Sequence, residues 1–280
     1  MKKIYLMMMA VCMCTVIFAQ NQKELLILHT NDTHSRIEPL LEIDPNPEIA
    51  GKAGYMRRAT FIRQMREANK DLLLFDCGDI SQGTPYYNMF RGELEFKLMS
   101  HMKYDAATIG NHEFDFGMEN MARLFKMASF PIVCANYDVR GTILEGLVHE
   151  YVVLKRKGLK IGVFGLSPEL DGLVQEKNCQ GIVYQDPGTR AQEVAYKLKH
   201  ELKCDLVICL SHMGWKGIKD SDYDWIPQTT DVDVVLGGHS HTYFHKVELV
   251  KNQNGVEVPV QQMGKNGAFV GVMRLKMQKK

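Results

Sequence analysis

The sequence predicts an α/β fold in which a largely parallel sheet is joined by a second, antiparallel portion. Short β-type runs recur along the chain, helix-like stretches separate several of them, and the last part of the chain reads as strand, turn and strand. Strands that alternate with helices indicate βαβ units and therefore a parallel sheet. With 45% hydrophobic and 24% charged residues, the 280-residue chain has an ordinary globular composition, which excludes disorder, collagen and coiled coil.

Each β-type run of the parallel portion ends in a cluster of polar residues. The five runs are Glu24–His29, Asp71–Phe75, Asp105–Ile109, Cys204–Leu210 and Val232–Leu236. Four helix-like stretches lie among them: Gly54–Ala68, Glu93–Met102, Met118–Met127 and Thr189–Lys203. No linker-like stretch divides the chain, so residues 21–280 are predicted to form one domain.

Two segments predict the antiparallel portion. Tyr151–Ser167 holds two apolar runs around the turn Lys155–Gly158, which is the pattern of a hairpin. The tail from Phe244 to Lys279 contains the turn Asn252–Gly255 and a last strand near Phe269–Met277.

The N-terminus has the pattern of a signal peptide over residues 1–20. Lys2 and Lys3 form a positive region, Ile4–Phe18 is apolar, and Ala19 is a small residue for cleavage. An apolar run of this length falls short of the ~20 residues that span a bilayer, which argues against a membrane anchor. The sequence therefore predicts a periplasmic or secreted protein without stable membrane insertion.

The charge balance points to no polyanionic partner. Lys plus Arg number 34 and Asp plus Glu number 33, so nothing indicates nucleic acid or a membrane surface as a partner. The five cysteines after residue 20 are dispersed and do not suggest a disulfide scaffold. Four of them lie in or beside apolar runs and are expected to be buried: Cys77, Cys134, Cys204 and Cys209.

Metal-ligand residue types gather at the predicted carboxyl ends of the strands, where α/β sheets bind ligands. Carboxylate, imidazole and amide oxygen together suit borderline divalent metals such as Zn, Mn or Fe. The set is larger than one catalytic metal needs, and two metals about 3.5–4 Å apart would use it economically. Because five such clusters follow five strands, unrelated surface polar residues explain the pattern poorly. The residues are Asp32, His34, Asp79, Asn111, His112, His212, His239 and His241.

Other conspicuous residues have plainer interpretations. His29 lies within an apolar run and is expected to be a packed histidine. Trp215 and Trp225 are expected to pack in the core or a loop rather than to contact a base or sugar. Four arginines in one helix-like segment are expected to form a solvated face: Arg57, Arg58, Arg63 and Arg66.

The polar clusters form short sequence motifs that together resemble the full motif set of the calcineurin-like metallophosphoesterases. The strings are Asp32-x-His34, Gly78-Asp79, Gly110-Asn111-His112-Glu113, Ser211-His212 and Gly238-His239-Ser240-His241. Longer strings are similar to the bacterial periplasmic 5′-nucleotidase/UDP-sugar hydrolase family, from about Leu25 to the C-terminus. They are His29 to His34, Gly78-Asp79 with Gln82-Gly83-Thr84, Gly110 to Gly117, and Leu236 to Thr242.

This resemblance implies a four-layer α/β/β/α sandwich of two mixed sheets and a site with two divalent metals. Asp32, His34 and His241 would hold one metal. Asn111, His212 and His239 would hold the other, with Asp79 as the bridge. His112 would be the catalytic histidine, oriented by Asp115. The metal would be Mn, Zn, Mg, Fe or Ca.

The function implied is hydrolysis of phosphate esters by a metal-bridging hydroxide, with nucleotides as the favoured substrates. The family carries a C-terminal nucleotide-recognition domain, which has no counterpart in this sequence, so a separately encoded domain is one expected partner. One alternative is a stand-alone 2′,3′-cyclic nucleotide phosphodiesterase or general phosphomonoesterase. An alternative of another class is a metal- or nucleotide-binding subunit with little activity alone.

Overall fold

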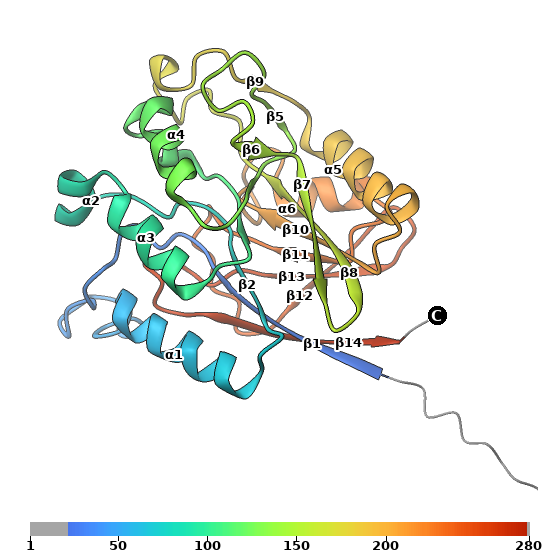
Figure 1. Cartoon of the computed structure of the whole chain (residues 1–280), viewed down its shortest axis with the longest axis horizontal. Helices are drawn as coiled ribbons and strands as arrows, with labels where there is room; N and C mark the ends of the chain where they lie inside the picture. Colours follow the sequence, from blue (N-terminus) through green and yellow to red (C-terminus); the bar gives the residue numbers. More distant parts are fainter. Residues whose placement is uncertain (1–21, 279–280) are drawn as a thin grey trace, which may run out of the picture.

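Two six-stranded mixed sheets form the centre of the computed structural model, which describes residues 22–278 (Figure 1). The first sheet has the order β14 (Gly271–Gln278), β1 (Gln22–Thr30), β2 (Leu73–Asp76), β3 (Ala106–Ala107), β4 (Ile132–Val133) and β6 (Val148–His149). The second has the order β12 (Glu248–Lys251), β13 (Glu257–Gln261), β11 (Val234–Leu236), β10 (Leu206–Ser211), β8 (Leu159–Leu166) and β7 (Tyr151–Arg156). A separate ribbon pairs β5 (Tyr137–Asp138) with β9 (Val183–Tyr184).

Parallel pairing fixes where the strands of both sheets end. In the first sheet β1, β2, β3, β4 and β6 are parallel, and β14 is antiparallel to β1. In the second sheet β8, β10, β11 and β13 are parallel, with β7 and β12 antiparallel at the edges. The carboxyl ends of parallel neighbours meet at one edge of each sheet, so the loops that follow them are neighbours too.

The helices lie on the outer faces. The longer ones are α1 (Tyr55–Ala68), α3 (Glu93–Met102), α4 (Gly117–Met127) and α5 (Pro187–Tyr196), which continues as the π-helical turn η3 (Lys197–Glu201). The shorter ones are α2 (Pro85–Phe90), α6 (Asp222–Trp225), and the 3₁₀ turns η1 (Asn111–Phe114), η2 (Glu176–Asn178) and η4 (Ile226–Gln228).

Strand β1 shows how the layers are built from sequence. Leu26 and Leu28 pack with residues of α1, α3 and α4, whereas Leu25 and Ile27 on the opposite face pack with β8, β10 and β11. Side chains of a strand alternate between the two faces, so a sheet covered on both sides needs an almost continuous apolar run.

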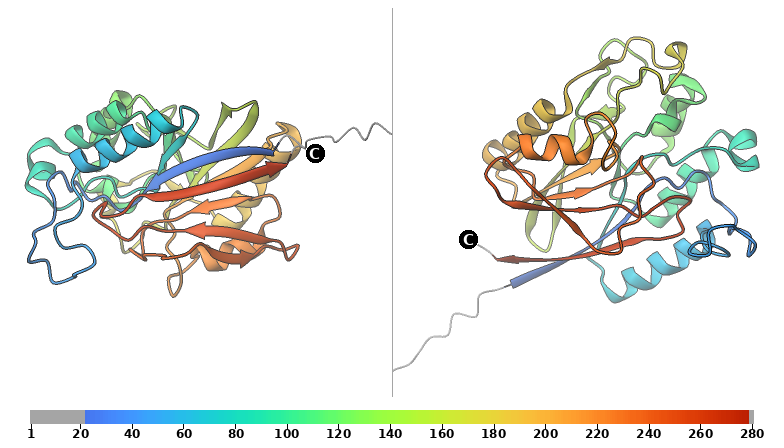
Figure 2. Two further views of the ribbon diagram at one scale, coloured as in Figure 1. Left: turned by 90° about the horizontal axis from the view of Figure 1, so that it is seen from below. Right: turned by 180° about the vertical axis from the view of Figure 1, so that it is seen from behind.

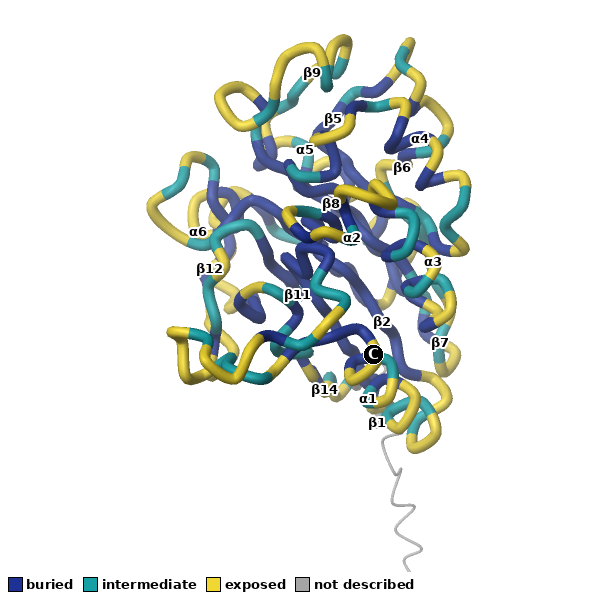
Figure 3. The backbone as a smooth tube through the Cα atoms, turned by 90° about the vertical axis from the view of Figure 1, so that its left-hand side faces the viewer, coloured by how far each residue is buried: buried dark blue, intermediate teal, exposed yellow. Residues whose placement is uncertain are grey.

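A third apolar cluster lies between the second sheet and α5 and α6. The layers are therefore α/β/β/α, as expected. In the left view of Figure 2 the helices α1 and α3 lie on one side of the β1–β14 pair, and the orange to red strands of the second sheet (β11, β12 and β13) lie on the other. Figure 3 shows the strands buried and the outer segments exposed.

The antiparallel segments extend both sheets instead of forming a sheet of their own. The hairpin β7–β8 turns at Lys157 and Gly158, both with positive φ, which matches a two-residue hairpin turn. The tail divides, because β12 and β13 join the second sheet whereas β14 returns to pair with β1. The sequence pattern predicts these strands but not the sheet that each one joins, which depends on pairing with distant strands.

One prediction about helix α1 is wrong. Arg58 is only 3% exposed, so the four arginines do not form one solvated face. Arg58 lies four residues before buried Ile62 and three after buried Tyr55, which places it on the inner face of α1.

Several other expectations can be compared with the described residues. Four cysteines are buried as expected, namely Cys77, Cys134, Cys204 and Cys209. Within residues 22–278 no helix is both long and apolar enough to cross a bilayer. The predicted signal peptide, residues 1–20, lies outside the described residues.

Candidate metal centre

The loops after five parallel strands bring the predicted ligands together from both sheets. Asp32 and His34 follow β1, Asp79 follows β2, and Asn111 begins η1 just after β3. From the second sheet, His212 follows β10, and His239 and His241 follow β11. The site therefore spans the junction of the two sheets at their carboxyl edges.

The side chains converge in two groups of three. Asp32, His34 and His241 form the first group, and Asp79, His212 and His239 form the second. Within each group the possible ligand atoms lie within 4.8 Å of one another. Metal–ligand bonds of about 2.0–2.2 Å bring the ligand atoms of one ion to separations of this order.

Individual distances show how tightly the atoms face one another. The Nε2 atoms of His34 and His241 are 3.0 Å apart, and the Nε2 atom of His241 is 3.5 Å from Oδ1 of Asp32. In the second group, Nε2 of His212 is 3.1 Å from Oδ2 of Asp79. The same Nε2 atom is 3.9 Å from Oδ1 of Asp32, so the two groups adjoin.

The backbone at several of the predicted ligands has a positive φ, which is the left-handed conformation. In the part of the chain that the structure describes, thirteen non-glycine residues have positive φ, and five of them are predicted ligands. Left-handed backbone is uncommon for side chains other than Asn, Asp and His, and such conformations gather at functional sites. The five ligands are Asp32 (φ 48°), His34 (φ 43°), Asp79 (φ 53°), His239 (φ 73°) and His241 (φ 54°).

Glycines permit the close approach of these loops. A Cβ atom on Gly78 would lie 2.7 Å from the backbone nitrogen of Gly110 and 2.8 Å from Nδ1 of His212. A Cβ atom on Gly238 would lie 2.9 Å from the same His212 nitrogen. All three distances are too short for real Cβ atoms, so only glycine fits beside His212 at these two positions.

Buried polar atoms with few or no protein partners face the same region. Oδ1 of Asn111 makes no hydrogen bond with the residues that the structure describes, and Nε2 of His212 faces only carboxylates, with Oδ2 of Asp79 at 3.1 Å. A buried polar atom left unpaired costs about 1–3 kcal/mol, so such atoms need a reason. A divalent cation supplies one, because an amide oxygen and an imidazole nitrogen both donate lone pairs to it. The residues present therefore fit a metal centre.

Hydrogen bonds behind the ligands fix their orientation. Nδ1 of His212 lies 2.6 Å from the carbonyl oxygen of Cys77, to which it donates, so its Nε2 faces the site. Oδ2 of Asp32 accepts from Nδ2 of Asn31 at 2.6 Å and from the backbone N–H of His239 at 3.0 Å. Partners of this kind orient metal ligands in proteins.

The charges of the metal-free site are unusual. Burial lowers the pKa of His34 to about 3 and the pKa values of His239 and His241 to about 4, so these three rings are neutral at pH 7. Burial also acts to lower the pKa of His212, but the Asp79 and Asp32 carboxylates outweigh it and raise that pKa to about 10. Without metal, the charge of the Asp79 carboxylate is thus balanced by the protonated His212 ring at the place where cations would bind.

His112 lies beside the ligand groups with its ring oriented by Asp115. Nδ1 of His112 is 3.2 Å from both carboxylate oxygens of Asp115, and its side chain is 27% exposed. The rings of His112 and His34 are 5.7 Å apart. Its Nε2 lies 2.8 Å from Nε2 of Gln82, a contact that the sequence analysis did not assign. Nε2 of His112 is thus the ring nitrogen that Asp115 leaves free, with the Gln82 amide beside it.

Glu113 is a second residue whose contribution was missed. Its Oε1 accepts backbone N–H groups of Ile80 (2.8 Å) and Ser81 (3.3 Å), and its Oε2 accepts those of Asp79 (3.0 Å) and Gly110 (2.6 Å). One carboxylate therefore joins the loop that carries Asp79 to the loop that carries Asn111. The motif contains both Glu113 and Gly110, but the other three partners lie more than thirty residues away and no local pattern reveals them.

Replacing Glu113 with glutamine is expected to weaken metal binding and stability together. Whichever way the amide turns, its NH2 group faces two backbone N–H groups that the carboxylate satisfied. At about 1–3 kcal/mol for each unsatisfied donor, the loss is about 2–6 kcal/mol. Calorimetric unfolding and metal titration measure both effects. Glu119→Gln, the same change at an exposed position in α4, is the matched control, and equal behaviour of the two variants would refute this role.

The remaining predicted residues take structural positions. His29 is fully buried and its Nε2 lies 3.1 Å from Oε1 of Gln261, as expected of a packed histidine. Trp225 is also fully buried, and Trp215 packs edge-on against Phe244 with ring centroids 4.9 Å apart. Both tryptophans are therefore packing residues, as expected.

The fold and the paired ligand groups define the class of a metal-binding α/β/β/α protein, and comparison with known proteins gives its family. The family profile described as calcineurin-like phosphoesterase matches residues 25–243. This chain belongs to the calcineurin-like phosphoesterases, a hydrolase family that uses divalent metals.

Relatives and solved structures agree with this assignment. The chain is 31% identical to a snake venom 5′-nucleotidase of Crotalus adamanteus, over 96% of this chain and 48% of the relative. It is 32% identical to the 5′-nucleotidase of Homo sapiens, over 92% of this chain and 47% of the relative. A 5′-nucleotidase precursor from Thermus thermophilus superposes with a TM-score of 0.82 at 32% identity, over 90% of this chain and 51% of that one. The chain thus spans about half the length of the relatives it matches.

Proposed function

We propose that this chain hydrolyses phosphate esters of nucleotides at a centre of two divalent metal ions. The observation that carries the proposal is the pair of adjoining ligand groups with His112 beside them. Family membership and the 5′-nucleotidase relatives support the reaction class. A protein that only bound metal or nucleotide would have no use for the oriented His112–Asp115 pair.

Seven side chains would hold the two ions. Asp32, His34 and His241 form one site, and Asn111, His212 and His239 form the other. Asp79 would be shared, since it lies where the groups adjoin: Nε2 of His212 is 3.1 Å from Oδ2 of Asp79 and 3.9 Å from Oδ1 of Asp32 in the first group. The imidazole-rich set favours Zn, Mn or Fe over Mg and Ca, which prefer oxygen ligands.

The protein residues supply positioning and proton transfer. When bound, two such ions stabilise charge on a phosphoryl group and activate water at neutral pH. His112 would donate a proton to the leaving oxygen through Nε2, which faces the site while Nδ1 is held by Asp115. Asp115 fixes the tautomer and ring angle of His112 as a carboxylate partner does for other catalytic histidines.

Substrate choice is a separate question from the chemistry. The relatives named 5′-nucleotidase are about twice as long as the matched region. We propose that a recognition domain, encoded with this chain or separately, sets the preference for nucleotides. Without it, this chain would act on a broader set of phosphate esters.

A hydrolysis panel tests the substrate class. The substrates are 5′-AMP, UDP-glucose, 2′,3′-cyclic AMP and a chromogenic phosphate ester, each assayed with and without a separately encoded recognition domain. Nucleotide hydrolysis that requires the second domain would support the split arrangement. Equal rates for the chain alone would favour a stand-alone phosphatase. Absence of turnover on all four substrates with metal present would refute the proposed function.

The N-terminal pattern supports a place of action outside the cytoplasm. We propose that residues 1–20 direct export and are removed. N-terminal sequencing of the protein from its native compartment would detect a start near residue 21, and an intact Met1 in the cytoplasmic fraction would contradict export.

A further inference from the structure

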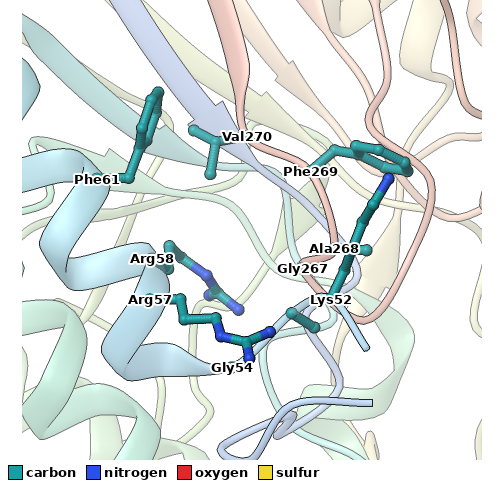
Figure 4. A pocket seen from close by; sticks show the side chains of 10 residues that line it. Lys52, Gly54, Arg57, Arg58, Phe61, Gly267, Ala268, Phe269 and Val270 are labelled. Carbon is teal, nitrogen blue, oxygen red and sulfur yellow. The ribbon is translucent and has the colours of Figure 1, made fainter. Parts of the chain in front are cut away.

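A cavity of about 380 Å³ lies between the start of α1 and the segment before β14 (Figure 4). None of the proposed metal ligands lines it. It adjoins the metal centre only through its wall, because the backbone N–H of Asn266 donates to the carbonyl oxygen of Asp32 at 2.7 Å. The cavity is therefore a separate feature that the proposed hydrolysis does not use.

The charged residues that line this cavity are all cationic. They are Lys52, Arg57 and Arg58, and among residues 22–278 neither Asp nor Glu lines it. Figure 4 shows Arg57 and Arg58 extending from α1 toward the segment with Gly267, and Lys52 lies across from them. Three like charges around one cavity repel one another, and an anion between them removes the repulsion.

Arg58 adds a second observation that itself points to a ligand. It is 3% exposed, and none of its three guanidinium nitrogens makes a hydrogen bond of good geometry with the residues that the structure describes, although Tyr104 and Asp76 lie near enough to act on its pKa. Its guanidinium stacks over the ring of Tyr55 at 4.2 Å. A Cβ atom on Gly267 would lie 2.1 Å from its Nη2, so the absent side chain leaves the space in which the guanidinium sits. Buried arginines ordinarily satisfy most of their five donors.

The helix itself favours an anion at the same place. Arg57 and Arg58 lie in the first turn of α1, which carries no acidic residue. The N-cap residue is Gly54, which has no side chain that could cap the helix. The N-terminus of a helix bears a partial positive charge and free N–H groups that attract anions. Cations in the first turn are therefore unfavourable unless a negative group lies among them.

Apolar residues form the rest of the wall. Phe61, Phe269 and Val270 line the cavity beside the cationic end. Phe269 is held in place by stacking on Tyr243, with ring centroids 4.0 Å apart, and Lys52 lies over its ring at 4.9 Å. The volume is within the range of pockets for small organic ligands.

We propose that this cavity binds a small organic phosphate, with the phosphate group among Lys52, Arg57 and Arg58 and the organic group against the apolar wall. Arginine forks match phosphate oxygens in geometry as well as charge. Such a ligand would satisfy the unpaired donors of Arg58, neutralise the first turn of α1 and cover the apolar wall at once.

Isothermal titration of the metal-loaded chain with phenylphosphonate, which cannot be hydrolysed at its C–P bond, tests the site. The wild-type chain is expected to bind one equivalent at the metal centre and one in the cavity. In the double variant Lys52→Ala/Arg57→Ala, binding of one equivalent should weaken at least tenfold. Both residues are exposed, so the variant is expected to fold, which circular dichroism checks.

The control carries the same loss of charge outside the cavity. Arg63→Ala/Lys70→Ala removes two exposed cations at and just beyond the second half of α1 and should bind like the wild type. The equivalent of phenylphosphonate that the wild type binds and Lys52→Ala/Arg57→Ala does not is the one in the cavity. This assignment holds even if the metal centre binds no phenylphosphonate. Superimposable isotherms for the wild type and Lys52→Ala/Arg57→Ala would overturn the proposal. Methylphosphonate that bound as tightly as phenylphosphonate would overturn the part assigned to the apolar wall.

Discussion

His112→Ala is expected to reduce kcat by about 10²–10⁴-fold while the chain keeps its full metal content. The structure supports this separation of effects. His112 lies beside both ligand groups but belongs to neither of them, and its Nδ1 is occupied by Asp115. Its removal therefore takes away the proton donor and leaves the seven proposed ligands in place.

The measurement combines steady-state kinetics on a chromogenic ester with metal analysis of the same sample. His101→Ala, at an exposed position in α3, controls for the loss of a histidine as such and should keep wild-type turnover. Unchanged turnover in His112→Ala would show that another group protonates the leaving oxygen. Loss of metal along with turnover would instead make His112 part of the metal centre.

Asp79→Asn is expected to lower the occupancy of both metal sites. Asp79 lies where the two ligand groups adjoin, is only 2% exposed, and faces His212 at 3.1 Å. Burial acts to raise the pKa of Asp79, but the His212 ring beside it outweighs burial and holds that pKa below its usual range. The carboxylate is thus negative in the folded chain, and a neutral amide cannot replace its charge between two cations.

Metal content by mass spectrometry after dialysis is the readout for Asp79→Asn. The variant should retain less than half of the wild-type metal and lose turnover in proportion. Asp171→Asn, at an exposed position, is the control for the same chemical change. Loss of one metal with full retention of the other would contradict a shared ligand.

The predicted residues converge in the structure because each lies in a short sequence motif directly after a strand. Asp32, Asp79 and His239 all follow apolar runs whose ends the pattern marks clearly. Parallel pairing then brings the strings to one edge, which is a general property of such sheets and needs no knowledge of the particular fold.

Features that depend on distant contacts were not predictable in this way. Glu113 acts on backbone groups of residues 79–81 and Gly110, and β14 finds β1 from the other end of the chain. Arg58 is a different case, because its spacing from Tyr55 and Ile62 already placed it on the inner face of α1. The cluster of arginines concealed that spacing, since a cationic segment is usually a solvated one.

Reconstitution of the metal-free chain tests the central claim most directly. Chelator-treated protein is titrated with Mn²⁺ or Zn²⁺ while hydrolysis of a chromogenic phosphate ester is followed. Two adjoining ligand groups predict no activity without metal and full recovery at two equivalents per chain. Full activity in the metal-free chain, or saturation at a single equivalent, would contradict a dinuclear centre.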